Sequence, residues 1–310
     1  MFIKVRDEKN FTLTLQDHLN GFDSLYNNVL LEKLNNEAKS ANKQYQVFYH
    51  QILPNCVKEK YKNLDLFFDV DLQEVKNFKK IYQIKFDINN KKFKYFFCSF
   101  LGAEHVSRQF FSAILNKTKL WNDLTCSKNF SYSWQTLDGN IESYVPNNCR
   151  YFRKFFIADS NFNEKIINMS NYKHCDTVEN IHKLKPIIDN SFVNIISETL
   201  GTSYVPFITE KFLQSIITKS LFLTYGQPNW HEYLEKYYGF KLYSNIFDYE
   251  FDKIKNPIHR VVKLIEMIQK FQHLSPSEWH DLYLIEKDAV EYNYNHYYSK
   301  DYLKHLAKFV

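Results

Sequence analysis

The segment SFVNIISETLGTSYVPFITEKFLQSIITKSLFLTYGQPNWHEYLEKYYG, residues 191–239, holds the patterns that decide the fold. Apolar and β-branched residues over 191–197 predict a buried strand, and a second such run over 221–225 predicts another. Between them, the apolar spacing after Thr209 predicts a helix, and a further helix is expected to end at Gly239. A strand, a helix and a strand in this order indicate a unit with parallel strands.

The alternation of strand and helix patterns extends through most of the 310 residues. It predicts an α/β fold with parallel sheets. Strand patterns on both sides of Asn89-Asn90 predict a hairpin with its turn at these asparagines. The expected organisation is a first unit over 1–95, a second unit over 96–285, and C-terminal helices over 286–310 that pack back on the first unit.

The composition is that of a globular protein with a large core, since 45% of residues are hydrophobic and 24% are charged. The net charge of +5 permits a phosphate or nucleic-acid partner without requiring one. The densest basic cluster, Lys91, Lys92 and Lys94, is expected at the solvated tip of the hairpin. Five widely spaced cysteines without a CxxC pair indicate free thiols in a reducing compartment.

Targeting and cofactor motifs are missing from the sequence. The first residues, MFIKVRDEKNF, do not form the apolar stretch of a signal peptide, and no apolar run approaches the ~18 residues of a membrane helix. We therefore expect a cytoplasmic protein with no membrane span, in the host cytoplasm if the chain is viral. There is no HExxH, GxGxxG or GxxxxGK[ST] pattern, so we expect neither a metal nor a cofactor.

The start of the helix after residue 208 has the residue types of an anion site. Thr209 can cap the helix through its hydroxyl, and Glu210 suits the positive end of the helix dipole. Capping does not account for Lys211, because a cation in the first turn is disfavoured unless an anion is bound there. A helix N-terminus combined with a lysine therefore predicts a phosphate site.

The same residues resemble a known enzyme family. The stretch YVPFITEKFLQSIITKSLFLTYG, followed by Gly239-Phe240, Phe247-Asp248-Tyr249 and Asp252, is similar to the donor-binding half of the fucosyltransferase-type glycosyltransferases. It most resembles their short relatives encoded in phage and marine genomes, which share a T-E-K motif. The resemblance implies two Rossmann-like domains facing a cleft, the arrangement called GT-B. It also implies that a nucleotide sugar lies mostly against the second domain.

The resemblance assigns roles to particular residues. It places Glu210, with Thr209 as the helix cap, near the ribose or base of the donor, and Lys211 on the diphosphate. Glu198 matches an acidic residue that ends the preceding strand close to the donor. Arg108, in CSFLGAEHVSR, matches an arginine that clamps a phosphate, although an ordinary exposed helix arginine is an equal alternative.

The implied reaction is sugar transfer to a hydroxyl group of a glycan or of a hydroxylated DNA base. Such a site works without a metal if Lys, Arg and a helix N-terminus stabilise the departing diphosphate. Inversion, which the family favours, requires a base from the first unit to take the acceptor proton. His50, at the end of YQVFYH, is the first candidate for this base, and Asp69, Asp71 and Glu104 are rivals.

Two other interpretations remain open. Asp69-Val70-Asp71 is a D-x-D pattern, which single-Rossmann (GT-A) transferases use to hold a divalent metal on the diphosphate, although Asp71 also suits a helix cap. Alternatively, the chain binds a nucleotide or nucleic acid without catalysis. An aromatic stripe near the C-terminus is expected to pack in a core or on the first unit rather than stack on bases; it comprises Tyr292, Tyr294, Tyr297 and Tyr298.

Overall fold

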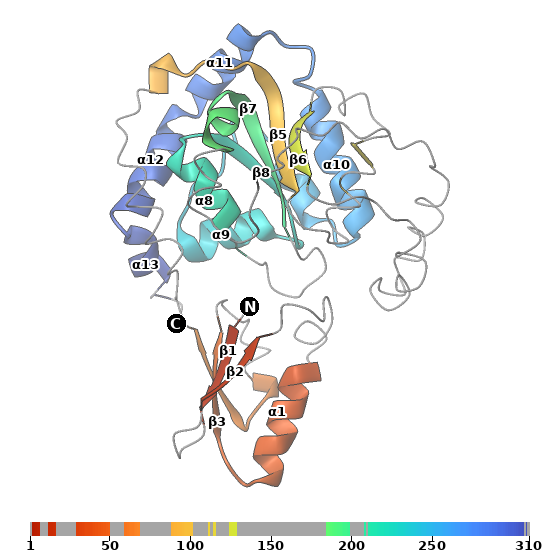
Figure 1. Cartoon of the computed structure of the whole chain (residues 1–310), viewed down its shortest axis with the longest axis vertical. Coiled ribbons are helices and arrows are strands. Elements are labelled where there is room, and N and C mark those ends of the chain that lie inside the picture. Colours follow the sequence, from red (N-terminus) through yellow and green to blue (C-terminus); the bar gives the residue numbers. More distant parts are fainter. Residues whose placement is uncertain are drawn as a thin grey trace.

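The computed structural model shows two separate β-sheets with helices around them (Figure 1). The structure describes residues 2–6, 12–16, 29–49, 59–68, 88–101, 111, 114–115, 124–128, 184–198, 208, 210–306 and 308. Among these residues, no helix combines the length and the apolar character that crossing a bilayer requires.

The first sheet is mixed rather than parallel, and its strand order is β2-β1-β3-β4. Strand β1 runs antiparallel to both β2 and β3, and only β3 and β4 are parallel. The prediction of parallel sheets is therefore wrong for this part of the chain, because the connection between Arg6 of β1 and Thr12 of β2 is too short for the crossover of a dozen or more residues that a parallel pair needs. The elements are β1 (Phe2–Arg6), β2 (Thr12–Gln16), α1 (Val29–Ser40), β3 (Tyr45–Tyr49) and β4 (Leu64–Phe68).

The second sheet is entirely parallel, with the order β6-β5-β7-β8. The chain passes from β5 to β6 on one side, then returns past β5 to β7 and β8 on the other. The direction of winding therefore reverses between β5 and β7, which makes this the switch point of the sheet. The strands are β5 (Tyr95–Leu101), β6 (Leu124–Lys128), β7 (Ser191–Ser197) and β8 (Leu221–Tyr225).

Helices cover both faces of the second sheet. Helix α8 and residues 184–189 lie on one face, where Ser215 contacts Asn194 and Leu184 and Ile188 pack on Cys98. Helix α10 lies on the opposite face, as Figure 1 shows. Every residue of β7 and β8 is consequently buried. The helices are α8 (Glu210–Ile217), α9 (Trp230–Tyr238), α10 (Pro257–Gln269), α11 (Pro276–Ile285), α12 (Lys287–Tyr298) and α13 (Asp301–Leu306), with 3₁₀ turns at Ile88–Asn90 and Tyr249–Lys253.

Aromatic side chains fill much of this second core. The Trp279 ring stacks on Phe96 of β5 and on Phe192 of β7, with centroids 5.4 and 6.1 Å apart. Such pairs contribute roughly 0.5–1.5 kcal/mol beyond the apolar area that they bury. These aromatic side chains of the second unit are thus used for packing.

The C-terminal helices pack on the second unit. Helix α12 contacts α8, and α13 contacts α9. The Asn293 side chain bonds both the amide and the carbonyl of Lys241, and a ring nitrogen of His305 lies 2.9 Å from the carbonyl oxygen of Lys236. Tyr297 is fully buried, which confirms core packing for part of the aromatic stripe, whereas Tyr292 is exposed. These described contacts differ from the expected packing on the first unit.

The hairpin predicted at Asn89-Asn90 is wrong. Residues 88–90 form a 3₁₀ turn, and β5 has parallel neighbours on both sides, which leaves no place for an antiparallel partner. Lys91, expected in solvent, is buried. Its ammonium donates to the carbonyls of Thr218 and Lys219 and to the Ser220 hydroxyl, so it caps the end of α8.

Burial lowers the pKa of Lys91 to about 7, because the charged ammonium loses its hydration. An unfolded chain restores a pKa near 10.5. Between these values the unfolded state holds more protons than the folded state, so the free energy of unfolding rises with pH. Below pH 7 both states are protonated, and the full cost of burying the charge is present.

We expect Lys91→Met to remove a pH dependence of stability. In the wild-type protein this lysine should raise the free energy of unfolding by about 2–3 kcal/mol from pH 7 to pH 9, at ~1.4 kcal/mol per pH unit. Urea unfolding at the two pH values measures the difference. Lys92→Met, at the exposed neighbouring position, is the control and should keep the wild-type slope. Equal slopes in all three proteins would contradict the assignment.

Candidate functional site

The candidate site lies at the carboxyl edge of the second sheet, beside the switch point. In open α/β sheets the crevice beyond the carboxyl ends of the strands, where the winding reverses, is the usual ligand site. Glu198 directly follows β7, and Lys211 lies in the first turn of α8. The turn over 226–229 follows β8 at the same edge. The fold therefore gathers two of the sequence-predicted residues at one edge.

Glu198 and Lys211 form an ion pair in which only the lysine reaches solvent. Lys211 Nζ lies 3.9 Å from Glu198 Oε2, and the two side chains are 23% and 0% exposed, respectively. A buried carboxylate is costly unless a cation and hydrogen-bond donors compensate its charge. Lys211 and the positive end of α8 both supply such compensation. The Glu198 amide also donates to the Tyr225 carbonyl at 2.9 Å, which extends the β7–β8 pairing to the site.

A buried polar contact fixes α8 against the strands that hold the site. Asn194, in the middle of β7, donates from Nδ2 to the Ser215 hydroxyl of α8 at 2.8 Å. The Cys98 thiol of β5 donates to the Asn194 side-chain oxygen at 3.5 Å. Burial raises the pKa of the Cys98 thiol to about 12, so it remains a donor. The contact links β5, β7 and α8, and the period-2 and period-3.6 patterns of the sequence gave no sign of it.

The turn after β8 depends on a glycine and a buried tryptophan. A Cβ atom at Gly226 would lie 2.9 Å from Cδ1 of Trp230, too close for two carbon atoms. Trp230 is fully buried, and its ring meets Phe212 of α8 edge-on with centroids 6.1 Å apart. Since Phe212 adjoins Lys211 in sequence, this contact places the first turns of α8 and α9 side by side.

Two buried polar residues, His231 and Asp252, lie next to the turn over 226–229. His231 is 1% and Asp252 is 2% exposed, and Nδ1 of the histidine lies 3.2 Å from Oδ1 of the aspartate. The sequence offered the family motif for Asp252, but it gave no reason to single out His231. The histidines of the chain fall at no metal-ligand spacing, and pairing across 21 residues is visible only in the fold.

A buried arginine of α10 lies against Tyr225, at the end of β8. Arg260 of α10 donates to the carbonyls of Ile254 and Lys255, and its guanidinium lies 5.8 Å from the ring centroid of Tyr225. The Tyr225 hydroxyl donates to the Pro257 carbonyl at 3.2 Å. Because Tyr225 is the last residue of β8, these contacts anchor the start of α10 to the carboxyl edge of the sheet.

Several predicted site residues lie outside the described part of the chain. Of the donor-binding candidates, Arg108 and Thr209 fall there, and for Glu210 only the backbone, as the first residue of α8, is described. The candidate bases fall there too, so their roles stay predictions; they are His50, Asp69, Asp71 and Glu104. Among the described residues, no group of three His, Cys, Asp or Glu side chains is placed to hold a metal ion.

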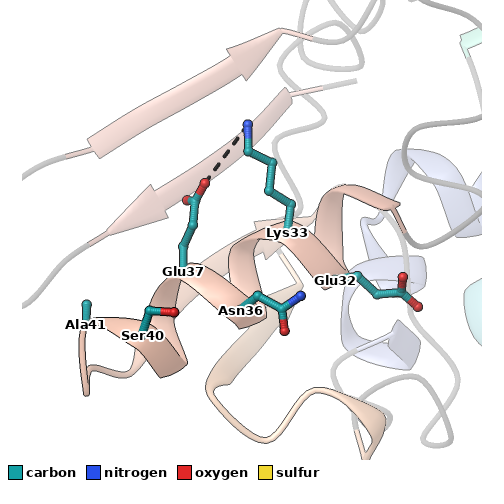
Figure 2. Close-up of a pocket in the computed structure, with 6 residues that line it drawn as sticks. All are labelled: Glu32, Lys33, Asn36, Glu37, Ser40 and Ala41. Carbon is teal, nitrogen blue, oxygen red and sulfur yellow. Dashed lines mark ion pairs between the residues drawn. The ribbon is translucent and has the colours of Figure 1, made fainter.

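A shallow depression on the first unit is lined by helix α1 and the residue that follows it. Figure 2 shows the side chains of α1 that line it, together with Ala41 directly after the helix, and there Lys33 forms an exposed ion pair with Glu37 at 4.0 Å. Glu32 is bound to Lys60 at 2.7 Å, also in solvent. Neither pair brings convergent polar groups into an enclosed space, which distinguishes this depression from a ligand site.

Comparison with protein-family models, curated proteins and solved structures finds no match to this chain.

We expect the Glu198–Lys211 pair to show coupling in a double-mutant cycle. Lys211→Met leaves a buried carboxylate without its cation and should lower the free energy of unfolding by roughly 1–3 kcal/mol, less than for a fully buried pair because Lys211 is partly solvated. Adding Glu198→Gln should recover part of this loss. Urea unfolding of the two single variants and the double variant measures the coupling. Additive effects, within about 0.3 kcal/mol, would show that the pair does not interact.

Proposed function

We propose that the chain is a glycosyltransferase that moves a sugar from a nucleotide-diphosphate sugar to a hydroxyl acceptor. The observation that supports this most is the position of Lys211. It lies in the first turn of α8, at the carboxyl edge of a parallel sheet and 3.9 Å from a buried carboxylate. The T-E-K motif of the resembling enzymes falls on the same helix start.

Lys211 has the properties that binding a diphosphate requires. Its side chain is held near the edge by Glu198, yet 23% of its surface is exposed to an incoming ligand. An ammonium carries three N–H donors, so contact with a carboxylate is compatible with contact to a phosphate oxygen. The N-terminus of α8 adds a favourable field for an anion. In the proposed complex the Lys211 ammonium and the N-terminus of α8 both contact the diphosphate.

The proposed role of these groups is electrostatic stabilisation of the leaving group. Breaking the bond between sugar and diphosphate builds negative charge on the diphosphate oxygens. A lysine and a helix N-terminus fixed before the reaction stabilise that charge without reorganising. In the proposal, inversion at the sugar carbon then needs a base near the acceptor, for which His50, Asp69 and Glu104 are the candidates.

Nucleotide binding is the first test. UDP or GDP at about 100 times its Kd should stabilise the folded protein by about 2.7 kcal/mol and raise the melting temperature by several degrees. Lys211→Met should lose most of this rise relative to its own ligand-free melting temperature. Lys304→Ala is the control, because this exposed lysine lies on α13, beside the carboxyl-terminal turn of α9. An undiminished rise in Lys211→Met would contradict the phosphate role.

Turnover is the second test, and it separates a transferase from a binding protein. Many transferases pass sugar slowly to water, so we expect nucleoside diphosphate to be released from one of the UDP-, GDP- or ADP-sugars, faster with glycan or modified-DNA acceptors. His50→Ala, Asp69→Asn or Glu104→Gln should lower this rate by about 10²–10⁴ while the nucleotide-induced rise in melting temperature stays. Nucleotide binding with no release from any donor would favour a non-catalytic nucleotide-binding protein.

A further inference from the structure

Helix α9 begins at the candidate site without a side-chain cap of its own. Its N-cap residue, Asn229, has a left-handed backbone (φ 61°), and its side chain makes no capping hydrogen bond. The first amides of any helix need acceptors from elsewhere. Here Asp252 supplies two of them, because its Oδ2 accepts from the His231 amide at 2.7 Å and its carbonyl accepts from the Asn229 amide at 2.7 Å.

His231 attaches the same helix to the last strand of the described sheet. The Tyr225 carbonyl faces β7, where it accepts from Glu198, so the adjacent Thr224 amide faces the opposite, outer side of β8. No further strand pairs with β8 in the described part of the chain. The Thr224 amide donates instead to Nε2 of His231 at 3.0 Å. The histidine thus takes the place of a neighbouring strand.

The two contacts of the imidazole determine its tautomer. A ring nitrogen that accepts from a backbone amide cannot carry a proton, so the proton of the neutral ring is on Nδ1. This N–H faces Asp252 Oδ1 at 3.2 Å, in a contact that is electrostatic rather than a well-aligned hydrogen bond. A negatively charged aspartate, which only accepts, is therefore the group that suits this position.

We infer that Asp252 and His231 are positioning residues for the nucleoside diphosphate. They hold the turn over 226–229 and the first turn of α9 against β8. Through the contact between Trp230 and Phe212, they also fix this turn beside Lys211. The inference rests on the proposed function and adds to it residues that are buried and touch no ligand. Without the pair, the turn and the lysine would no longer share one fixed geometry.

Asp252→Asn tests the role of the carboxylate at nearly constant size. One oxygen of the asparagine can still accept from the His231 amide, but its NH₂ group then faces Nδ1–H, so two donors meet. Moving the histidine proton to Nε2 would instead oppose the Thr224 amide. We therefore expect the turn to loosen, with hydrogen exchange of the peptide over 224–232 becoming faster.

The decisive measurement is the affinity of the full chain for UDP, GDP and ADP by calorimetry, well below the melting temperature of every variant. Asp252→Asn should weaken the Kd of the bound nucleotide roughly tenfold, as expected for small misplacement of a binding group. Ser275→Ala is the matched control, since it removes the capping box of α11, away from the turn. It should lower the melting temperature and speed exchange in α11 without changing the Kd.

Unchanged affinity in Asp252→Asn, with or without faster exchange over 224–232, would overturn the inference while leaving the proposed function in place. Wild-type protein that binds none of the three nucleotides would overturn both. If Asp252→Asn does not fold, His231→Gln decides, because a glutamine oxygen can still accept from Thr224 but lacks the Nδ1–H that faces Asp252. It should also weaken the Kd severalfold, and wild-type affinity in this variant would count against the positioning role.

Discussion

The covering of the second sheet on both faces is the constraint on which the rest of this structure depends. Because β7 and β8 are buried at every residue, polar groups can act only where the strands end or where each one is paired inside the core. The strands are parallel, so their carboxyl ends lie at a single edge, and the winding reverses at that edge between β5 and β7. Glu198 lies at this edge with a fully buried side chain, and Lys211 forms an ion pair with its carboxylate.

Polar contacts at three positions along α8 hold this helix against the sheet. Lys91 holds the carboxyl-terminal end of α8, Asn194 joins the second turn of α8 to β7, and Lys211 joins the start of α8 to Glu198. Helix α9 is held at its own start by Asp252, and its first residue packs on α8 through Trp230. In each contact, one polar group offsets the cost of burying another. The contacts therefore stabilise the core and fix the geometry of the edge at the same time.

Local patterns were sufficient for the elements that border the site. The apolar runs over 191–197 and 221–225 are the strands predicted, the amphipathic spacing gives α8, and Gly239 ends α9 with a left-handed backbone. The same reasoning failed at Asn89-Asn90. Apolar runs on both sides of a turn signal are typical of a hairpin, but this local pattern does not show which strands pair with each other. The pairing of the second sheet shows that parallel strands occupy both sides of β5.

The sequence by itself determined the parallel β7-α8-β8 unit and the charged helix start, because both depend on residue spacing along a short segment. Only the tertiary structure decided which polar groups meet. Lys91 caps a helix 127 residues away, and Asp252 reaches His231 across 21 residues. Such pairs follow from the need to satisfy each buried donor and charge. The partner is whichever group the fold brings close, so local sequence patterns do not predict which residues pair.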